Sequence, residues 1–384
     1  MMDALRRIRI PALVLALAPA FAGIGGCAAD EGTIRIAIAG PVGQITGHSM
    51  RLAAELAVDE INRAGGVRGR RIELVIRDDE ASPERAIEIA TELRDDPSIV
   101  AVVGHINSGA TLAAAKIYND DENGIVAVSP ASSSPLISDA GPWIFRVCPS
   151  DLLHGPALAR WAYERLGAQR VAAIYANDDY GRGVIETFGA AFVAAGGQVL
   201  SRDPYLPDML ESANAVDPYL ERAVRNGMDA LMIAGQADAA ERIIAAARRL
   251  GYTGPVIGPD GLTNLRDAGS LAEGVYISSA FLPDRQDPAA QAFVRAYQER
   301  FRELPDHRGA MTYDAIRLLA RAIEQVGTNR TAIRDYLANV GQTADNPAFE
   351  GVSGTIRFDA NGDVAGKEVT IGVVRAGRLV TAGS

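Results

Sequence analysis

Short apolar runs alternate along most of the chain with segments whose apolar residues recur at helical spacing. Residues 33–39 form an aliphatic run of strand length, whereas residues 50–63 place Leu52, Leu56 and Ile61 on one repeating face. Strands that alternate with helices through short connections form parallel sheets covered on both faces. The pattern therefore predicts an α/β fold. The other predicted strands are 71–77, 99–103, 125–128, 171–176, 230–234 and 256–258, and the other predicted helices are 111–118, 152–166, 183–195, 218–226 and 237–250, with one more beginning at Ser82.

The alternation is interrupted at residues 142–150, 275–288 and 349–358, and a hairpin over 355–380 is predicted to close the chain, with turns at Asn361-Gly362 and Gly377. A chain of 384 residues exceeds one typical domain. The interruptions therefore predict three crossings between two lobes, and such crossings act as hinges. The predicted lobe 1 comprises 33–147 and 278–354, and the predicted lobe 2 comprises 148–277 and 355–384.

The N-terminus has the pattern of a targeting segment. Arg6, Arg7 and Arg9 precede an apolar run over residues 10–22, which is short for a transmembrane helix. The sequence leading to Cys27 resembles the lipobox of bacterial lipoproteins, which implies a signal peptide over residues 1–26 and lipid attachment at Cys27. The alternative is an ordinary secretory signal followed by an incidental cysteine. No later segment is apolar enough to span a membrane.

Charge and motifs narrow the class of function. The formal net charge of -10 lacks the basic excess that a nucleic-acid partner requires. The sequence contains no P-loop, no Gly-x-Ser-x-Gly elbow and no metal-binding histidine pair, so we expect no cofactor, no metal and no enzymatic activity. His105 is expected to pack or cap rather than bind a ligand. Cys148, in an apolar run, is expected to be a buried, inert thiol.

Two loops that follow predicted strands carry small polar residues. The first, residues 104–110, opens a helix, and its free N–H groups together with the hydroxyl of Ser108 suit a carboxylate. A plain helix cap explains the same residues. The second, residues 129–135, contains four serines and two prolines, and presents Ser133 and the carbonyl of Ala131. A turn whose serines bond their own backbone is the alternative there.

A third loop, residues 256–261, carries Asp260 between proline and glycine. This placement is common for a residue that merely forms a turn. In a closed cleft, however, a carboxylate pairs with an ammonium group through a strong charge-assisted hydrogen bond. Donors for a carboxylate on one side and a carboxylate for an amine on the other are the features that an α-amino acid requires.

Several motifs, taken in order, carry a resemblance to a known family. They are residues 36–41, 59–69, 78–79, 178–181 and 258–261, together with the two serine-containing loops. The chain resembles the type I periplasmic binding proteins, in particular the branched-chain amino-acid (leucine/isoleucine/valine) receptors of ABC importers. The resemblance spans about residues 33–380 and implies two doubly wound parallel-sheet lobes joined by a three-segment hinge.

The resemblance also implies roles for individual residues. Ser108 matches the serine that binds the ligand carboxylate, Ser133 the residue that touches carboxylate and amine, and Ala131 the carbonyl that accepts from the amine. Asp260 stands in for the acidic partner of the amine, and Tyr180 matches an aromatic lining residue of the second lobe.

The departures from the family are informative. Thr46 and Gln236 stand near positions where leucine-type receptors have tyrosines, and Asn107 occupies a neighbouring wall position. Polar groups need partners when buried, so this pocket suits a small or polar side chain better than leucine. The family's internal disulfide is also absent, because Ala81 and Ser82 occupy the region of the expected cysteine.

The expectation is thus an extracytoplasmic solute-binding lipoprotein of an ABC importer that captures an amino acid or close analogue by lobe closure. It would reside in the periplasm or cell envelope, contact the membrane only through its lipid anchor, deliver to permease subunits and bind no nucleic acid. Two alternatives remain open: the same module as a ligand sensor for a signalling partner, and a binder of an amide, urea or aromatic acid.

Overall fold

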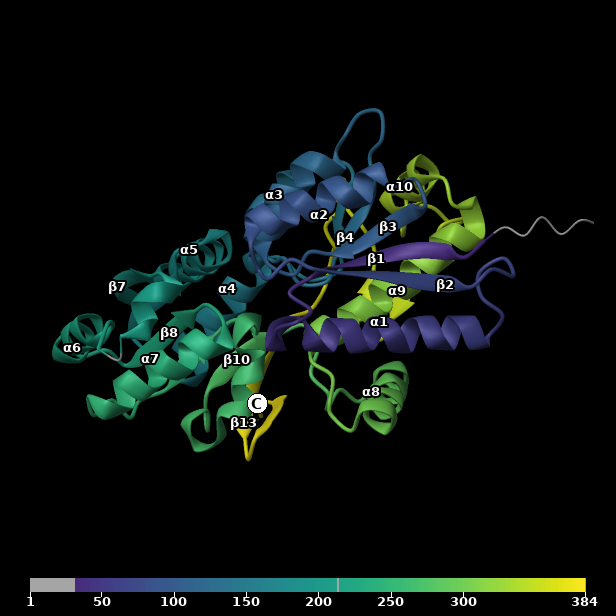
Figure 1. Cartoon of the computed structure of the whole chain (residues 1–384). Coiled ribbons are helices and arrows are strands. Elements are labelled where there is room, and N and C mark those ends of the chain that lie inside the picture. The colour runs from purple at the N-terminus through teal and green to yellow at the C-terminus, as the bar shows by residue number, and fades with distance from the viewer. Residues whose placement is uncertain (1–31, 213, 384) are drawn as a thin grey trace, which may run out of the picture. The chain divides into compact units, whose positions relative to one another are not determined.

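Two sheets of mainly parallel strands organise this computed structural model, which describes residues 32–212 and 214–383 (Figure 1). The predicted signal peptide and Cys27 lie outside these residues. The first sheet has the strand order β2-β1-β3-β4-β5, and all of its strands are parallel. Its strands are β1 (Ile34–Gly40), β2 (Ile72–Asp78), β3 (Ile99–Gly104), β4 (Ala127–Ser129) and β5 (Ile144–Arg146). We call this sheet and the elements packed on it lobe 1.

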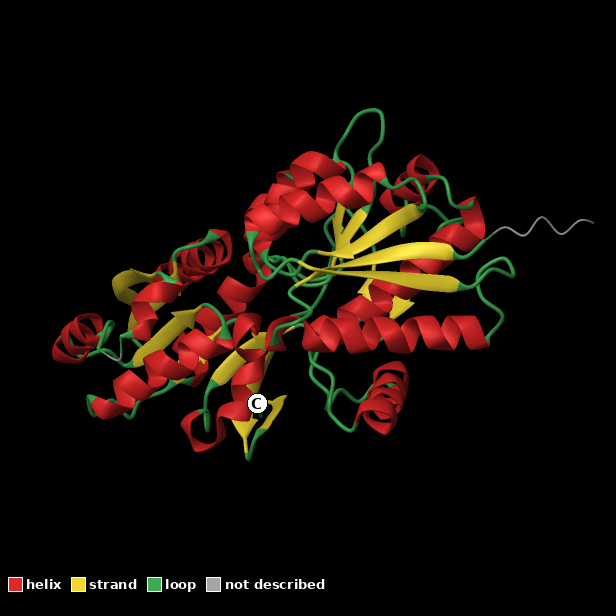
Figure 2. Cartoon of the chain, viewed as in Figure 1, coloured by secondary structure: helices red, strands yellow, loops and turns green. Residues whose placement is uncertain are grey.

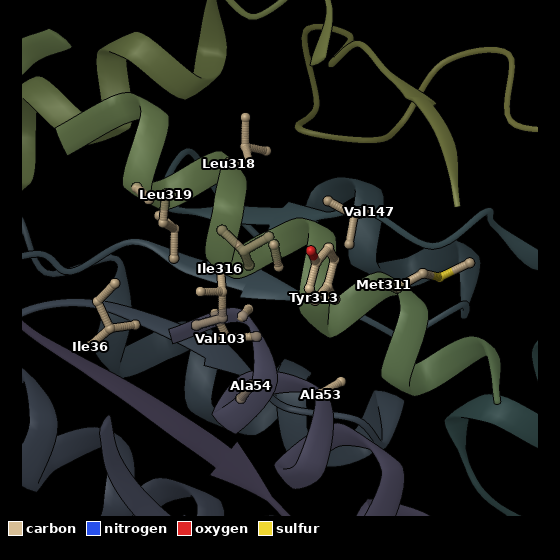
Figure 3. Packing of buried hydrophobic residues seen from close by; sticks show 14 of the residues in the cluster. Ile36, Ala53, Ala54, Val103, Val147, Met311, Tyr313, Ile316, Leu318 and Leu319 are labelled. Atoms are coloured by element: carbon tan, nitrogen blue, oxygen red, sulfur yellow. The ribbon is translucent and has the colours of Figure 1, made fainter. Parts of the chain in front are cut away.

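Helices cover both faces of the lobe 1 sheet, and β1 shows why. Its successive side chains point to opposite faces, so Ile36 and Ile38 enter one core cluster while Ala37 and Ala39 enter another. The larger cluster is packed by α1 (Ile45–Arg63), α8 (Pro288–Phe301), α9 (His307–Val326), α10 (Arg330–Ala338) and the hairpin β11 (Phe349–Gly351)–β12 (Gly354–Ile356). The smaller one is packed by α2 (Pro83–Asp95) and α3 (Ser108–Tyr118). Figure 3 shows α9 packed on the sheet through residues such as Ile316 and Tyr313.

The second sheet, with the elements packed on it, forms lobe 2. Its strand order is β14-β13-β10-β9-β8-β6-β7, with only β13 and β14 antiparallel to their neighbours. The strands are β6 (Arg170–Ala176), β7 (Gln198–Tyr205), β8 (Ala230–Ala234), β9 (Val256–Gly258), β10 (Tyr276–Ser279), β13 (Thr370–Arg375) and β14 (Arg378–Thr381). The helices are α4 (Asp151–Arg160), η2 (Trp161–Arg165), α5 (Asp179–Ala194), η3 (Pro207–Glu211), α6 (Asp217–Arg225), α7 (Ala237–Arg249) and η4 (Asp260–Leu271). Figure 2 shows how helices and strands alternate in both lobes.

Both lobes repeat one topology. In each, the first strand along the chain lies between the second and the third, which gives the order 2-1-3-4-5 for the five parallel strands. In open α/β sheets, ligands bind outside the carboxyl ends of the strands where this order reverses. The switch points are β1/β3 in lobe 1 and β6/β8 in lobe 2. The loops that leave them carry Asn107 in lobe 1 and Gln236 in lobe 2, and the first turns of the following helices carry Ser108 in α3 and Tyr180 in α5.

The chain passes between the sheets three times, between β5 and α4, between β10 and α8, and between β12 and β13. The first two passages fall within the predicted interruptions. The third does not fall where expected, because residues 349–356 form a short hairpin, and Phe358 and Val364 are still part of the lobe 1 core. Residues 355–364 therefore pack with lobe 1, and the chain leaves that lobe only after Val364.

The single closing hairpin predicted over 355–380 is also wrong. Asn361-Gly362 does turn the chain, between the bridged residues Phe358 and Val364, while Gly377 turns the separate β13–β14 hairpin. Helices α1, α3 and α5 begin earlier than predicted, because polar or glycine-rich first turns carry little apolar periodicity. Strand β7 and helices α8, α9 and α10 were not predicted. Within the described residues, no helix has the length and apolar character needed to cross a bilayer.

Candidate functional site

A cavity of about 150 Å³ lies where the strand ends of the two lobes face each other. Six residues singled out from the sequence line it: Asn107, Ser108, Ala131, Tyr180, Gln236 and Asp260. Thr46 lines an adjoining groove of about 470 Å³, which shares Asn107 and Gln236 with the cavity. Ser133 is fully buried and is not part of the lining of either space. The topology thus gathers side chains that are up to 153 positions apart, from Asn107 to Asp260, around one space.

The lobe 1 wall begins with the first turn of α3. Asn107 holds the N-cap position, but its side chain makes no capping hydrogen bond, and its Oδ1 is buried without a partner among the described residues. Ser108 Oγ accepts a hydrogen bond from the Ser134 N–H at 3.2 Å, which leaves its own O–H available to donate. A plain helix cap therefore does not account for these two side chains.

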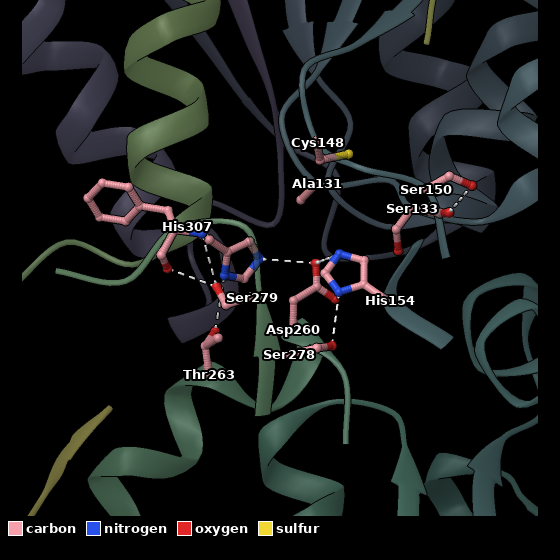
Figure 4. A network of polar contacts seen from close by, with 12 residues as sticks. Ala131, Ser133, Cys148, Ser150, His154, Asp260, Thr263, Ser278, Ser279 and His307 are labelled. Carbon is pink, nitrogen blue, oxygen red and sulfur yellow. Dashed lines mark hydrogen bonds and ion pairs between the residues drawn. The ribbon is translucent and has the colours of Figure 1, made fainter. Parts of the chain in front are cut away.

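The serines of residues 129–134 have different environments. Ser129 and Ser132 donate to the carbonyl oxygen of His105, and Ser134 Oγ accepts from the Leu136 N–H. These three serines therefore form hydrogen bonds with the backbone, as expected for a turn without a role in ligand binding. Ser133 differs, because its buried hydroxyl has no hydrogen-bond partner among the described residues. Figure 4 shows Ala131 and Ser133 facing Asp260 and His154.

Asp260 forms the lobe 2 side of the cavity. Its side chain is almost fully buried, and Oδ1 accepts a 2.7 Å hydrogen bond from the Tyr180 hydroxyl. The same hydroxyl accepts from the Gly261 N–H at 2.8 Å, so Tyr180 fixes the orientation of the carboxylate as well as lining the cavity. Asp260 is therefore more than a residue that forms a turn.

Two histidines flank Asp260, with His154 Nε2 and His307 Nε2 at 3.7 and 3.6 Å from its Oδ2 (Figure 4). Burial lowers the pKa of His154 and lowers that of His307 to about 4, so both rings are neutral at pH 7. Burial opposes ionisation of Asp260, but the charge that the two histidines carry when protonated in acid, the Tyr180 hydroxyl and Arg308 more than offset it and hold its pKa below the usual value. At pH 7, where the rings are neutral, the Tyr180 hydroxyl and Arg308 are the groups that favour the carboxylate. The cavity therefore contains an ionised carboxylate without a full cationic partner.

Asp151, in the first turn of α4, lies close to this group. Neither of its carboxyl oxygens has a hydrogen-bond partner among the described residues, and its N–H donates to the Ser133 carbonyl oxygen at 2.8 Å. Burial, together with the charge of Asp260, raises the pKa of Asp151 well above its usual value. Protonation is therefore favoured at Asp151 over Asp260, whose pKa is lowered.

A buried charge pair from lobe 1 completes the wall. Arg308, in the first turn of α9, is 2% exposed and lines the cavity. Its Nη1 lies 3.3 Å from Asp306 Oδ2 and 3.2 Å from Thr263 Oγ1, and its Nη2 lies 3.3 Å from Gln236 Oε1. Asp306 also caps α9 by accepting from the Gly309 N–H. Arg308 therefore connects lobe 1 to two residues of lobe 2.

Sequence reasoning did not identify Asp151, His154, His307 or Arg308 as part of the site. Asp151 and His154 lie in the first turn of α4 after the cap residue Ser150, and His307 and Arg308 lie in the first turn of α9 after the cap residue Asp306. Nothing in the sequence shows that these two helix starts converge on Asp260. The expectations for two other residues are confirmed. His105 is buried between Asp79 and Tyr118, and Cys148 is a buried free thiol whose pKa is raised by burial.

The arrangement suits a small zwitterion chemically. One wall offers hydroxyl and backbone donors at the start of a helix, where a carboxylate is stabilised. The opposite wall offers an ionised, oriented carboxylate, which favours an ammonium group. Among the described residues, no three His, Cys, Asp or Glu side chains are grouped so as to hold a metal ion.

Comparison with known proteins agrees with this architecture. A family model described as periplasmic binding protein matches residues 35–378. A leucine-, isoleucine-, valine-, threonine- and alanine-binding protein of Pseudomonas aeruginosa is 28% identical over 367 residues, which cover 92% of this chain and 93% of that protein. Among solved structures, an ABC transporter substrate-binding protein of Desulfitobacterium hafniense in complex with Leu is 32% identical, with a TM-score of 0.79 over 91% of this chain and 100% of that chain. A leucine-binding protein of Thermotoga maritima is 29% identical, with a TM-score of 0.82 over 91% of this chain and 98% of that chain. The chain therefore belongs to the periplasmic binding protein family and is a solute-binding protein, not an enzyme.

Proposed function

We propose that this protein captures a free α-amino acid with a small or polar side chain and delivers it to the permease of an ABC importer. The observation that carries the proposal is Asp260, a buried and ionised carboxylate that lines the same cavity as Ser108 and Ala131. Three relatives whose names state leucine, or leucine with other amino acids, as their ligand support the same class of ligand.

The ligand carboxylate is assigned to lobe 1. The first N–H groups of α3 have no partner within the helix, and the positive end of the helix dipole favours an anion there. Ser108 has a hydroxyl proton to donate, because its oxygen already accepts from the Ser134 N–H. The family resemblance assigns Ser133 to the same group, and its hydroxyl is buried without a partner among the described residues, behind the lining of the cavity.

The ligand ammonium is assigned to Asp260. The Ala131 carbonyl and the Ser133 hydroxyl are assigned as two further acceptors on the lobe 1 side, and Ala131 lines the same cavity as Asp260. An ammonium group has three donors, so these three acceptors match its capacity. Removing one partner of such a buried charge pair costs about 2–5 kcal/mol of binding free energy.

The ligand side chain is assigned to the polar part of the cavity and the adjoining groove. Asn107, Gln236 and Thr46 line this region, and each would need a partner if an aliphatic chain covered it. The cavity of about 150 Å³ is also small. An engineered cavity of that volume holds benzene, which has six carbon atoms, so a small amino acid fits it best. Threonine and alanine, named as ligands of the Pseudomonas relative, are amino acids of the size and polarity that we propose.

We propose that the two lobes close on the ligand, because residues of both lobes line the cavity in which it would bind. Ligand stabilises a closed state only by touching both lobes at once. The three crossing segments provide the hinge, and the hydrogen bond from Arg308 to Gln236 is one link that opening would break. The predicted lobe compositions, 33–147 with 278–354 and 148–277 with 355–384, belong to this proposal, with the difference at residues 355–364 described above.

The location proposed for the protein is the periplasm, with lipid attached to Cys27 after removal of residues 1–26. A Cys27→Ser variant tests this assignment through metabolic labelling with radioactive palmitate. We expect label on the native protein and none on the variant. Equal labelling of both, or label on neither, would contradict lipid attachment at this residue.

Calorimetric titration of the purified protein with the twenty common amino acids and their 2-deamino analogues tests the proposed ligand class. We expect micromolar or tighter binding of at least one amino acid with a small or polar side chain, and binding at least about 30-fold weaker for its 2-deamino analogue. Failure of every amino acid to bind, or equal binding of the deaminated acid, would refute the proposal.

A further inference from the structure

Arg308 is not explained by recognition of a zwitterion. The proposed contacts to carboxylate and ammonium involve Ser108, Ala131, Ser133 and Asp260, yet a nearly fully buried guanidinium also lines the cavity. Its Nη atoms are used, at 3.2–3.3 Å, by Thr263, Asp306 and Gln236. Its Nε has no hydrogen-bond partner among the described residues.

The charge of Arg308 is already balanced. Burial opposes ionisation of Asp306, but Arg308, His307 and Arg266 together lower its pKa to about 2, so its carboxylate is ionised at neutral pH. The cavity wall also includes Asp260 and Asp178. A further anionic group would therefore enter a region that is already negative on balance. What Arg308 has left to offer is a hydrogen-bond donor rather than an unpaired charge.

Asn107 supplies the complementary group. It lines the same cavity and extends into the adjoining groove. Its Oδ1 is buried and has no donor among residues 32–212 and 214–383, and its side chain is not used to cap α3. Among the described residues, the cavity wall thus contains a buried donor atom, Arg308 Nε, and a buried acceptor atom, Asn107 Oδ1, without partners.

Building on the proposed amino-acid function, we propose that Arg308 and Asn107 select a side chain with a neutral group that both accepts and donates hydrogen bonds, namely a hydroxyl or a carboxamide. The Arg308 Nε–H donates to the oxygen of that group, and Asn107 Oδ1 accepts its hydrogen. The selected ligands are serine and threonine on the one hand, and asparagine and glutamine on the other.

The same two atoms reject other amino acids for different reasons. An aliphatic side chain leaves both Arg308 Nε and Asn107 Oδ1 buried and unpaired, and each such unpaired group weakens binding. A carboxylate side chain has no hydrogen for Asn107 and adds negative charge beside Asp260 and Asp306. Sites built to bond a ligand hydroxyl or N–H discriminate strongly against analogues that lack it.

Calorimetry with matched ligand pairs tests the inference. Threonine and valine have the same shape, as do asparagine, aspartate and, approximately, leucine. If the selected group is a hydroxyl, we expect threonine to bind at least about 100-fold more tightly than valine. If it is a carboxamide, we expect asparagine to bind at least about 100-fold more tightly than leucine and aspartate. The factor is the combined effect of leaving two buried groups of the protein unpaired. If valine and leucine bind as tightly as their polar counterparts, the side-chain inference is wrong while the amino-acid function stands. If no amino acid binds, the proposed function itself fails.

Variants assign the selectivity to the two residues. Asn107→Leu removes the acceptor without breaking a hydrogen bond of the folded protein, and we expect the preference for the polar member of the pair to fall at least about tenfold. Asn226→Leu, at an exposed position after α6, is the control and keeps the wild-type preference. Arg308→Lys keeps the charge beside Asp306 but removes Nε, and is expected to reduce the same preference. Unchanged ratios in both site variants would overturn the assignment.

Discussion

Ser133 shows how a single buried side chain distinguishes a role in binding from a role in folding. Its hydroxyl has no partner among the described residues, whereas the neighbouring Ser132 hydroxyl bonds the His105 and Ile106 carbonyl oxygens and the Thr111 hydroxyl. We expect Ser133→Ala to change the free energy of unfolding by less than about 0.5 kcal/mol, and to weaken amino-acid binding by about 1.5–3 kcal/mol, as for a hydrogen bond to a charged group. Urea denaturation and calorimetry measure the two effects.

Ser132→Ala is the matched control, because it should lower the stability by about 1–3 kcal/mol through unpaired buried groups. If Ser133→Ala destabilised the protein as much as Ser132→Ala and left binding unchanged, the hydroxyl of Ser133 would have a structural role instead.

His307 predicts a specific dependence of stability on pH. Burial lowers its pKa to about 4, whereas the unfolded chain has the ordinary value near 6.5. As the pH falls below 6.5, the unfolded chain binds a proton that the folded protein does not, so stability is lost on acidification. Between pH 7.5 and 5.0 this single group is expected to remove about 2 kcal/mol.

Urea denaturation of wild type and His307→Gln at these two pH values isolates the contribution. We expect the wild type to lose about 2 kcal/mol more than the variant over this interval. Equal losses in the two proteins would show that His307 is not held neutral by its surroundings.

At the residue scale, the sequence could predict the site residues that follow recognisable strands, but not those that helix packing brings to the site. Ser108, Ala131 and Asp260 follow predicted strands, so the parallel topology places Ser108 and Ala131 at the carboxyl end of one sheet and Asp260 at the carboxyl end of the other. Arg308 and His307 lie in a region for which no element was predicted. Their meeting with Asp260 and Gln236 depends on how α9 packs across the sheet, which local patterns do not encode.

At the scale of elements, the contact between α5 and the start of η1 (Pro135–Asp139) is expected to report on lobe closure. Gly183 of α5 has no room for a side chain, since a methyl carbon there would lie 2.9 Å from Pro135 Cδ and 3.2 Å from Asp151 Oδ2. Pro135 belongs to lobe 1 and Gly183 to lobe 2, so the clash with Pro135 exists only while the lobes are together. Separated lobes would relieve it.

We therefore expect Gly183→Ala to weaken amino-acid binding by about 1–3 kcal/mol through overpacking of the closed state. The stability of the protein without ligand should not fall by the same amount, because alanine favours a helix over glycine by about 1 kcal/mol. Calorimetry and thermal denaturation measure the two quantities.

Gly189→Ala, in the same helix α5, is the control for helix propensity. A methyl carbon there would meet only the flexible guanidinium group of Arg202, which belongs to lobe 2, and Gly189 lines neither the cavity nor the adjoining groove. Its effect on binding should be clearly smaller than that of Gly183→Ala. Equal effects of the two variants would contradict closure at the contact between α5 and Pro135.

The elements themselves were predictable where their pattern was strong. Strands β3 and β8 are continuous apolar runs and β1 is interrupted only by Arg35, and these strands match the expected runs closely. The closing segment was not predictable in the same way, because residues 349–381 contain several short pairings whose partners are set by tertiary packing.

At the scale of the whole molecule, two lobes of the same topology place their switch points against each other. The repetition of the order 2-1-3-4-5 means that each lobe contributes the end of a parallel sheet to one cavity. The alternation of strands and helices and the interruptions predicted this organisation from sequence. The central claim is that the two lobes hold opposite ends of one zwitterion, with Asp260 as the partner of the ammonium group.

A thermodynamic cycle measured by calorimetry tests this claim most directly. Wild type and Asp260→Asn are each titrated with the amino acid that binds best and with its 2-deamino analogue, which gives the coupling energy between the carboxylate and the ammonium group. We expect a coupling of at least about 2 kcal/mol, so that most of the loss caused by either change disappears once the other has been made. A coupling near zero, with the two losses simply adding, would contradict the pairing of Asp260 with the ligand amine and with it the proposed mode of binding.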